Sequence, residues 1–366
     1  MSLIQLKINN FRNIFSGNYS FLPHFNIIHG ENGSGKTSLL EAIYFIGHGK
    51  SFRTHLVNQL VQHDFEGFNL FAQIEQKEDI PTKIGVERIS SASTKIKING
   101  QICHSAAELA TLLPMQIVNP DSYKLLEASP KYRRKFLDWG LFHVEHCFLT
   151  VWRSFQKTLA QRNSALKLQL SEAEINIWNE ELQFYAEQLS DLRKQYFLNL
   201  QQLMFNMLKD HSILHKLTCI YERGWPEQED YKSILIKNLP KDRQIGYTKY
   251  GPQRADIKFL IDEHPAQQVL SRGQQKILVG FLSLAQGILC KQLINKTCLY
   301  LIDDLASELD DQHKKYLFNQ LAKLEAQVFI SGVNQAELKQ IVEGYPHQMF
   351  HVEHGHLIFS ADGTTV

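Results

Sequence analysis

The sequence predicts an α/β protein in which both ends of the chain build one sheet-containing lobe around a helical insertion. Strand-like patterns with one early helix come first, two long stretches of helical periodicity follow, and strands and helices alternate again after Gly251. Because the strand patterns lie in the outer segments, we expect those segments to fold together. The predicted division is residues 1–120 and 251–366 for the first lobe, with a helix near 270–293, and residues 121–250 for the helical lobe or arm.

Composition limits the class of protein. The chain of 366 residues is 43% hydrophobic and 21% charged, which predicts a globular protein of about two domains. A formal net charge of +1 gives no overall attraction to nucleic acid or anionic lipid, so either partner would need a local basic patch. Five scattered cysteines without a C-x-x-C pair argue against a disulfide framework or a zinc site and favour a reducing compartment, the cytosol. The longest uncharged apolar run, residues 277–290, is too short to span a bilayer and predicts a buried helix, with no membrane partner.

Short segments with β-branched residues or alternating apolar positions predict the strands of the first 120 residues. These segments are LIQLKI, FNIIHG, FNLFAQIE, TKIGVER and TKIKING, the last with an Asn-Gly turn. The early helix follows the second segment, after a glycine-rich turn.

That turn predicts a nucleotide site. Gly30, Gly35, Lys36 and Thr37 fit G-x-x-x-x-G-K-[ST] in the strand–turn–helix context that this motif requires. Backbone N–H groups would hold phosphate oxygens, Lys36 would neutralise the β- and γ-phosphates, and the Thr37 hydroxyl would ligate Mg²⁺. We therefore expect a nucleoside triphosphate with Mg²⁺. The predicted contacts are Gly30, Glu31, Asn32, Gly33, Ser34, Gly35, Lys36, Thr37 and Ser38.

The middle of the chain predicts a helical hairpin. Residues 130–167 and 175–208 have helical periodicity and no internal proline, and their irregular heptad pattern argues against an extended coiled-coil arm.

The two arms of this hairpin differ in charge. Residues 124–167 hold nine lysines and arginines against three acids, whereas residues 171–191 hold six acids and no Lys or Arg. The basic arm is a candidate DNA surface, and ordinary solvated helix faces are an equally weighted alternative. The candidate contacts are Arg133, Arg134 and Lys135.

A second anion site is predicted at residues 270–276. This segment, LSRGQQK, precedes a long apolar helix and resembles the LSGGQ signature of ATP-binding-cassette (ABC) proteins. The Ser271 hydroxyl and nearby N–H groups would lie at the helix N-terminus, although a serine that only caps a buried helix is the alternative. We expect this site to hold the nucleotide of another copy, which predicts a dimer with two nucleotides at its interface. The residues expected to act in trans are Ser271, Arg272, Gly273 and Gln274.

The segment CLYLIDD, residues 298–304, predicts a buried parallel strand with carboxylates at its C-terminal end, where α/β sheets bind ligands. Asp303 would hold Mg²⁺ through water. Asp304 stands where a base or a water-orienting carboxylate is needed beside the γ-phosphate, so we expect it to be catalytic. A core strand with capping acids is the alternative for this motif alone.

With these motifs in this order, the chain resembles the SMC-like branch of ABC ATPases and, most closely, the RecF family of bacterial recombination-repair proteins. The resemblance runs through nearly the whole chain. Its stretches are LKINNFRNI, GENGSGKTSLLEAIYFIGHGKSFR, SPKYRRKFLDWG, YGPQRADI, LSRGQQK and LYLIDDLASELD.

The resemblance implies an ABC-type ATPase head with a mixed sheet in lobe I and a helical lobe II. It also implies an ATP-dependent homodimer that binds single-stranded DNA, duplex DNA and their junctions, at gaps and stalled replication forks. Such a protein would assist RecO and RecR in loading RecA and would contribute to DNA repair, replication and SOS induction, with weak DNA-stimulated ATPase activity.

Further residue roles follow from the resemblance. Arg12 and Gln116 are expected to contact nucleotide, Arg53 to face DNA or nucleotide, and Ser307 and Asp310 to form a D-loop that crosses the dimer interface. Ser331 and Asn334 stand where transporter ATPases place a switch histidine, which suggests slow hydrolysis.

Two other ABC-type proteins are the main alternatives. A transporter ATPase subunit shares the motifs but needs about half of the roughly 240 residues that separate the P-loop from the signature here. A nuclease with an SMC-like head would carry a metal-binding domain after the D-loop, where only about 55 residues remain. A simple P-loop kinase would leave LSRGQQK unexplained.

Overall fold

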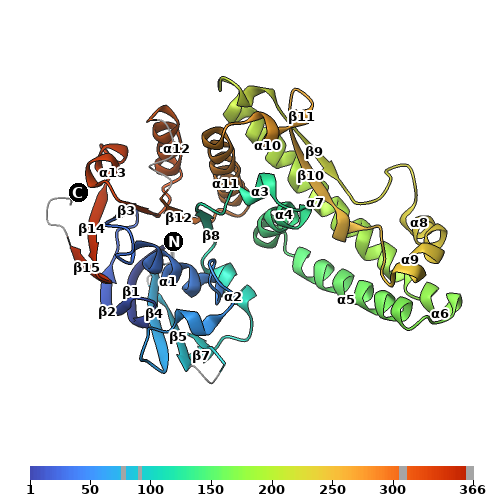
Figure 1. Ribbon diagram of the computed structural model, residues 1–366, viewed down its shortest axis with the longest axis horizontal. Coiled ribbons are helices and arrows are strands. Elements are labelled where there is room, and N and C mark those ends of the chain that lie inside the picture. Colours follow the sequence, from blue (N-terminus) through green and yellow to red (C-terminus); the bar gives the residue numbers. More distant parts are fainter. Residues whose placement is uncertain (76–79, 90–92, 305–310, 360–366) are drawn as a thin grey trace. The chain divides into compact units, whose positions relative to one another are not determined.

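The computed structural model describes residues 1–75, 80–89, 93–304 and 311–359 (Figure 1). The chain forms two compact units. Unit 1 comprises Met1–Ser122 and Val279–Val366, and unit 2 comprises Tyr123–Leu278. The α/β class is therefore as predicted. The compact units divide at 122/123 and 278/279, whereas the predicted lobes divide at 120/121 and 250/251.

A mostly parallel sheet forms the centre of unit 1, in the order β15-β14-β3-β13-β12-β8. Every residue of β3, β12 and β13, three of its four inner strands, is buried, as expected when a parallel sheet is covered on both faces. The last hairpin adds the only antiparallel pairing of this sheet among the described residues. The strands are β3 (Phe25–His29), β8 (Met115–Val118), β12 (Leu299–Asp303), β13 (Val328–Gly332), β14 (His347–Glu353) and β15 (His356–Phe359).

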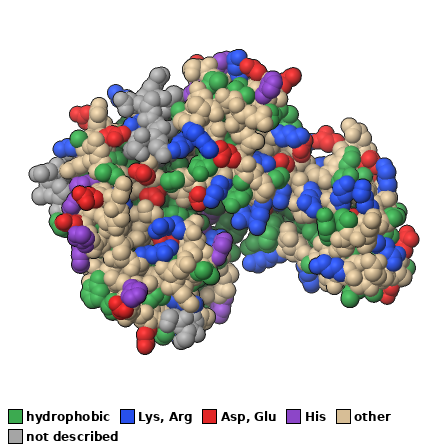
Figure 2. Space-filling view, viewed as in Figure 1, with side chains coloured by type: hydrophobic (Ala, Val, Ile, Leu, Met, Phe, Trp, Pro, Cys, Tyr) green, Lys and Arg blue, Asp and Glu red, His purple; other side chains and the backbone are tan. Residues whose placement is uncertain are grey.

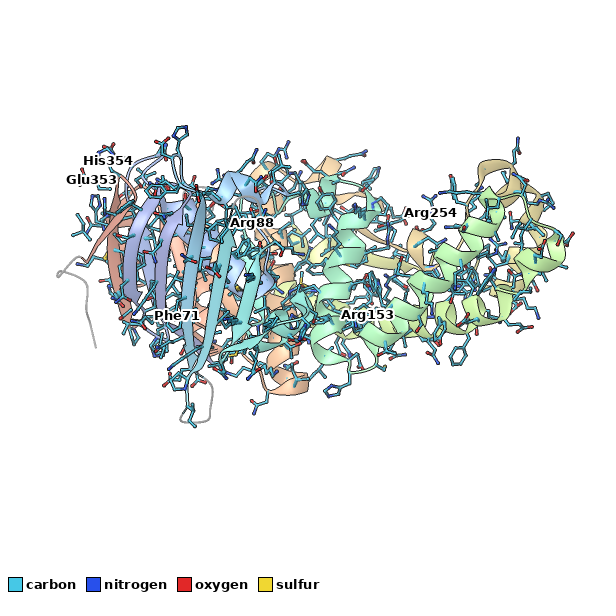
Figure 3. The ribbon with its side chains drawn as sticks, turned by 90° about the horizontal axis from the view of Figure 1, so that it is seen from below. Phe71, Arg88, Arg153, Arg254, Glu353 and His354 are labelled. Atoms are coloured by element: carbon cyan, nitrogen blue, oxygen red, sulfur yellow. The ribbon has the colours of Figure 1, made fainter. Side chains whose placement is uncertain are left out.

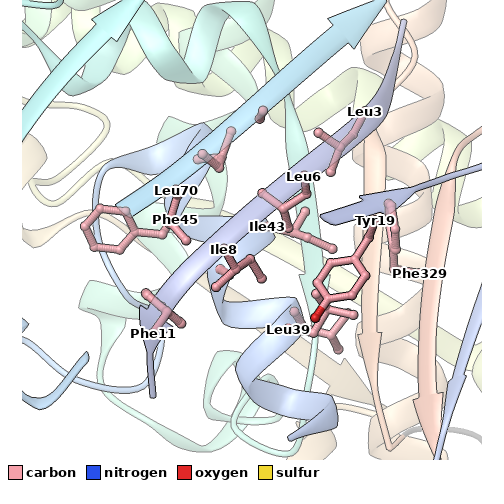
Figure 4. Close-up of a cluster of buried hydrophobic side chains, with 14 of the residues drawn as sticks. Leu3, Leu6, Ile8, Phe11, Tyr19, Leu39, Ile43, Phe45, Leu70 and Phe329 are labelled. Atoms are coloured by element: carbon pink, nitrogen blue, oxygen red, sulfur yellow. The ribbon is translucent and has the colours of Figure 1, made fainter. Parts of the chain in front are cut away.

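An antiparallel sheet, in the order β2-β1-β4-β5-β6-β7, completes unit 1. Alternate residues of its strands, such as Leu6, Ile8 and Leu70, are buried in a core that also contains Ile43 and Phe45 of the P-loop helix (Figure 4). This packing fixes the P-loop helix between the two sheets. The strands are β1 (Ser2–Phe11), β2 (Ile14–Ser20), β4 (Gly67–Glu75), β5 (Thr82–Ile89), β6 (Lys95–Ile98) and β7 (Gln101–Ile102). The helices of unit 1 are α1 (Lys36–His48), α2 (Ala106–Leu112), α12 (Asp311–Lys323) and α13 (Gln335–Ile341), with the short helix η1 (Val57–Leu60).

Unit 2 is mainly helical, with a three-stranded antiparallel sheet in the order β11-β10-β9. Its strands are β9 (Leu217–Glu222), β10 (Asp256–Ile261) and β11 (His264–Pro265). Its helices are α3 (Lys124–Glu127), α4 (Pro130–Val144), α5 (Phe148–Lys167), α6 (Glu172–Asn176), α7 (Asn179–Leu208), α8 (Tyr231–Lys237), α9 (Leu239–Ile245) and α10 (Ala266–Val269), with the short helices η2 (Leu214–Lys216) and η3 (Pro252–Arg254). Because β10 pairs with β9, the strand expected in the first lobe after Gly251 belongs to unit 2.

The predicted first helix of the hairpin is broken. Residues 145–147 separate α4 from α5, and α7, with 30 residues, is shorter than expected. The apolar helix α11 (Arg272–Ile294) passes from unit 2 into unit 1. By length and composition it could cross a membrane, but 72% of its most apolar window is buried inside the protein, as in a core helix.

Buried ion pairs hold unit 2 together and use part of the predicted basic arm. Arg162 is fully buried; its guanidinium donates to Asp242 Oδ2 at 2.9 Å, Thr248 Oγ1 at 2.6 Å and Asn179 Oδ1 at 3.1 Å. A buried arginine with this many acceptors links α5, α7 and α9.

Arg162→Ala is therefore expected to lower the free energy of unfolding by about 3–5 kcal/mol, because it leaves the Asp242 carboxylate buried without its cation. Urea denaturation of the variant would measure this. Lys157→Ala, an exposed change on the same helix, is the control and should alter stability by less than about 0.5 kcal/mol. Equal effects of the two substitutions would contradict a structural role for Arg162.

Candidate nucleotide-binding site

The P-loop lies between β3 and α1, as the sequence predicts. Gly33 and Gly35 have φ values of +80° and +124°, which a residue with a Cβ adopts only with strain. Gly30 passes so close to β14 that a Cβ would lie 2.3 Å from the Val352 carbonyl oxygen. Glycine is therefore required at these positions by the path of the loop.

Lys36 lies at the N-terminus of α1 and is almost buried, at 8% exposure. Its ammonium donates to the carbonyl oxygens of Gly30 at 2.7 Å and Glu31 at 2.8 Å, so it sits inside the loop. Burial lowers the pKa of Lys36, and the nearby carboxylates of Asp304 and Asp303 oppose that shift. The site thus combines a cation with backbone N–H donors, as an anion such as a phosphate requires.

Thr37 faces the acidic end of β12. Its hydroxyl oxygen lies 3.1 Å from both carboxylate oxygens of Asp303. The parallel pairing of β12 with β13 places Ser331 beside Asp303, and the Ser331 hydroxyl donates to Asp303 Oδ1 at 2.6 Å. Burial raises the pKa of Asp303, and the bonds from Ser331 and Thr37 counteract it. A serine hydroxyl thus holds the carboxylate toward Thr37.

Asp304 follows directly and adopts a left-handed conformation, with φ of +56°. Its backbone N–H donates to Ser331 Oγ at 3.2 Å, while its side chain is exposed and lines the cleft. Asp tolerates this conformation better than most residues. The turn therefore separates two neighbouring carboxylates, one buried against Thr37 and one directed into the cleft.

Two arginines also line the cleft. Arg12 makes a bidentate pair with Glu41, at 2.9 Å for each bond, and donates to the Gln59 carbonyl oxygen at 2.9 Å. Arg53 reaches the same carboxylate at 3.6 Å and is 47% exposed. Glu41 itself is fully buried in α1 and also accepts a bond from Ser51. One buried carboxylate therefore positions two cations at the cleft.

These groups enclose a cleft of about 500 Å³ within unit 1, a size in the usual range for small-molecule sites. Its lining residues are Arg12, Asn13, Asn32, Gly33, Gly35, Lys36, Thr37, Ser38, Arg53, Gln59, Val61, Asp303 and Asp304. Most of the residues predicted to bind nucleotide therefore come together, with Asn13, Gln59 and Val61 added by the fold.

The signature segment lies in unit 2. Ser271 is exposed and precedes α11; its hydroxyl accepts from the Gln274 N–H at 3.3 Å, and Gln274 Oε1 accepts from the Ser271 N–H at 2.9 Å. This reciprocal arrangement is a capping box. Arg272 pairs with Glu127 and lies over the Tyr123 ring, at 5.1 Å from its centroid. Ser271 and Gly273 thus remain at the helix N-terminus, whereas the Arg272 guanidinium is directed at protein partners.

Several residues with expected roles at the site lie away from the cleft or outside the described residues. Gln116 is buried, its amide donates to Gln286 Oε1 at 3.1 Å, and it does not line the cleft. Asn334 caps α13 by accepting from the N–H groups of Ala336 and Glu337, and of the two switch-position residues only Ser331 approaches the site. Ser307 and Asp310 lie outside the described residues.

The candidate DNA contacts on α4 also change. Arg133 makes a bidentate pair with Asp256 at 2.6 and 3.1 Å and donates to two backbone carbonyls. Arg134 donates to the Ala255 carbonyl oxygen at 2.7 Å, and burial lowers its pKa, with Arg193 adding to the effect. Both guanidinium groups therefore bind protein acceptors and hold β10 and its start against α4. Lys135 is exposed and remains a candidate contact for DNA.

Comparison with known proteins decides the family. The sequence matches the family described as RecF/RecN/SMC N-terminal domain over residues 2–356. It is 41% identical to the DNA replication and repair protein RecF of Shewanella loihica, covering 97% of this chain and 98% of that protein. It is 43% identical to the RecF of Stutzerimonas stutzeri, covering 98% and 97%. The chain belongs to the RecF family.

Solved structures agree with the RecF assignment. The fold matches that of the recombination mediator protein RecF-ATP in the RecFOR pathway with a TM-score of 0.86 and 29% identity, covering 98% of this chain and 97% of that one. An SmcHead bound to the C-winged helix domain of ScpA matches with a TM-score of 0.59 and 15% identity, which shows a shared fold alone. The predicted ABC-type ATPase head of the SMC-like branch is thus confirmed.

Proposed function

We propose that this RecF-family chain is an ATP-dependent DNA-binding recombination mediator, with unit 1 as its ATPase lobe I and unit 2 as its lobe II. One observation carries the proposal that ATP binds here. The Thr37 hydroxyl oxygen lies 3.1 Å from both carboxylate oxygens of Asp303, next to the buried side chain of Lys36. The named relatives support the repair part, since they are DNA replication and repair proteins, and one solved relative is RecF-ATP, a recombination mediator of the RecFOR pathway.

Mg²⁺ fits this site. A threonine hydroxyl and a carboxylate are hard oxygen donors, and Mg²⁺ in phosphate sites usually takes only one or two protein oxygens and keeps several waters. Thr37 would hold the ion directly and Asp303 through water. The ion would supply charge neutralisation for the β- and γ-phosphates. The protein's own contribution is to fix the Asp303 carboxylate by the Ser331 bond and to hold Lys36 beside the phosphates.

Asp304 is the proposed catalytic residue. Its carboxylate is exposed to the cleft and is not the carboxylate that Thr37 contacts, so it would orient an attacking water. No histidine takes the switch position, and Ser331 is already bound to Asp303, which supports a slow ATPase.

Asp304→Asn is expected to leave ATP affinity within about threefold while hydrolysis falls by about 10²–10⁴, the usual contribution of a positioned acid or base. The ATP-bound dimer should therefore accumulate on DNA. Binding of a fluorescent ATP analogue and phosphate release would separate the two effects. Loss of nucleotide binding itself would show that Asp304 holds the metal ion.

A composite dimer is the proposed active state. The P-loop belongs to unit 1 and Ser271 to unit 2, and the second anion site would serve the ATP of a partner copy, with Ser307 and Asp310 at the same interface. Hydrolysis would then release the dimer from DNA.

The proposed DNA partners are single-stranded DNA, duplex DNA and the junctions between them at gaps and stalled forks. The proposed protein partners are RecO and RecR, which this protein would assist in loading RecA in the cytoplasm. Figure 2 shows Lys and Arg side chains spread over the face of unit 2, with fewer Asp and Glu among them. A transporter subunit or a nuclease head is not supported, because the named relatives are RecF proteins and the matches cover 97–98% of both chains.

Gel shifts with single-stranded, duplex and gapped DNA, each with and without ATP, would test this function. We expect DNA to be retained only with ATP. Equal binding without nucleotide would contradict the proposal.

A further inference from the structure

The antiparallel sheet of unit 1 has an outward face that takes no part in the cleft. Side chains of β1, β4 and β5 alternate between the core and this face: Leu70 and Ala72 are buried, whereas Asn69 is exposed and Phe71 is partly exposed. Figure 3 shows this face toward the viewer with Phe71 on it, and no described helix lies over it.

The face is basic. Four exposed lysines project from β1, β5 and β6, against Glu87 within the face and Glu75 at its end. These lysines are Lys7, Lys83, Lys95 and Lys97. None of them forms an ion pair with a carboxylate among the described residues. In a chain with a net charge of only +1, this local excess favours an anionic occupant.

One row across the sheet joins these charges to an aromatic ring. Lys7 pairs with Phe71, Phe71 with Gly85, and Gly85 with Lys97. The Lys7 ammonium lies 5.8 Å from the centre of the Phe71 ring. Three strand spacings separate the Cα atoms of Lys7 and Lys97, about 14 Å. The row therefore presents a cation, an aromatic ring, a gap and a second cation.

The gap at Gly85 has no explanation inside the fold. Its φ is not among the positive values of the chain, and no atom lies within 4 Å of the position that a Cβ would occupy. Glycine in the interior of a strand weakens it and often marks a point where another molecule approaches closely. The row therefore has open space at Gly85, between Phe71 and Lys97.

We propose that this sheet face binds single-stranded DNA, with a base stacked on Phe71 beside Gly85 and with Lys7 and Lys97 contacting the neighbouring phosphates. The proposal rests on the DNA-binding function above and adds to it a surface and a strand preference. An aromatic ring flanked by lysines on an open sheet suits unpaired bases, which a duplex keeps stacked internally. An acidic protein segment would use the lysines but gives no reason for the aromatic ring beside the open space at Gly85.

Three disruptive variants and one conservative variant of the full chain test this. Binding of a labelled oligothymidylate in the presence of ATP would be followed by fluorescence anisotropy. Phe71→Ala should weaken binding by about tenfold, and Phe71→Tyr should restore it. Gly85→Val should weaken binding while thermal stability stays equal or rises, because valine favours strands and has room. Lys7→Gln/Lys97→Gln should lower the slope of log affinity against log salt by about 1.4, the value for two lost single-strand phosphate contacts.

The matched control is Lys315→Gln/Lys323→Gln, which removes the same charge from exposed positions of α12 in the same unit and should leave the slope unchanged. ATP-dependent binding of a duplex of the same length, measured in parallel, should be unaffected by Phe71→Ala.

Unchanged single-strand affinity in all three disruptive variants would overturn the inference and leave an acidic protein segment as the occupant. Equal losses for duplex and single strand would overturn the strand preference. Wild-type protein that binds duplex but no single strand would overturn this inference alone, and failure to bind either DNA would overturn the proposed function as well.

Discussion

Lys36→Ala is expected to abolish ATP-driven dimerisation and ATP-dependent DNA binding. The Lys36 ammonium is the cation within the P-loop, and its removal leaves the phosphates of a bound nucleotide without their main neutralising charge. Truncating one partner of a buried charge pair costs about 2–5 kcal/mol, which corresponds to ATP affinity at least about 30-fold weaker. Calorimetry with ATP would measure the affinity, and light scattering the dimer fraction.

The fold of the Lys36→Ala variant should persist. Among the described residues the side chain donates only to two loop carbonyls, and its charge costs free energy to bury, so its loss leaves the cores of both sheets intact. Lys50→Ala, an exposed change just beyond α1, is the control and should behave as wild type. A normal dimer fraction for Lys36→Ala at saturating ATP would exclude the P-loop as the trigger of dimerisation.

The parts of the site that depend on neighbouring residues in sequence could be predicted. The P-loop, the strand that ends at Asp303 and the helix after Ser271 each have a local pattern whose physical cause lies within about ten residues. These elements appear in the structure where the sequence places them.

The parts of the site and fold that depend on pairing between distant segments could not be predicted. The bond from Gln116 to Gln286 joins residues 170 positions apart, and the ion pair of Arg133 with Asp256 joins residues 123 positions apart. The pairing of β10 with β9 likewise joins strands that are separated in sequence by α8 and α9. A formal charge count could not separate arginines that bind carboxylates inside unit 2 from lysines that reach solvent.

The sequence does contain a signal that Glu41 needs partners at the site. It is the single carboxylate within an apolar helix, SLLEAI, and a buried carboxylate needs cationic or hydroxyl partners. Arg12, Ser51 and Arg53 provide them. The row of Lys7, Phe71, Gly85 and Lys97, by contrast, depends on the register of four strands and has no local signal.

Mixing two inactive variants should restore ATP hydrolysis if the site is composite. In a two-fold dimer each ATP would be held by the P-loop of one subunit and the signature of the other. Lys36→Ala destroys the first half and Ser271→Arg the second, because an arginine at that helix N-terminus adds bulk and a cation among donor N–H groups. Each variant alone then forms only defective sites. A heterodimer joins the intact P-loop of the Ser271→Arg subunit to the intact signature of the Lys36→Ala subunit, giving one whole site.

Random mixing makes half of the dimers mixed, with one good site of two, so DNA-stimulated hydrolysis should recover to at most about a quarter of wild type. Light scattering would measure ATP-dependent dimerisation, which should return in the same mixture. This measurement does not depend on cooperation between the two sites in hydrolysis. Ser105→Arg is the matched control for loss of a capping serine, since Ser105 caps α2 away from the cleft, and it should retain full activity alone. If both variants are folded and exchange subunits, yet neither hydrolysis nor dimer returns, Ser271 serves only as the cap of α11 and the ATP site is complete within one chain.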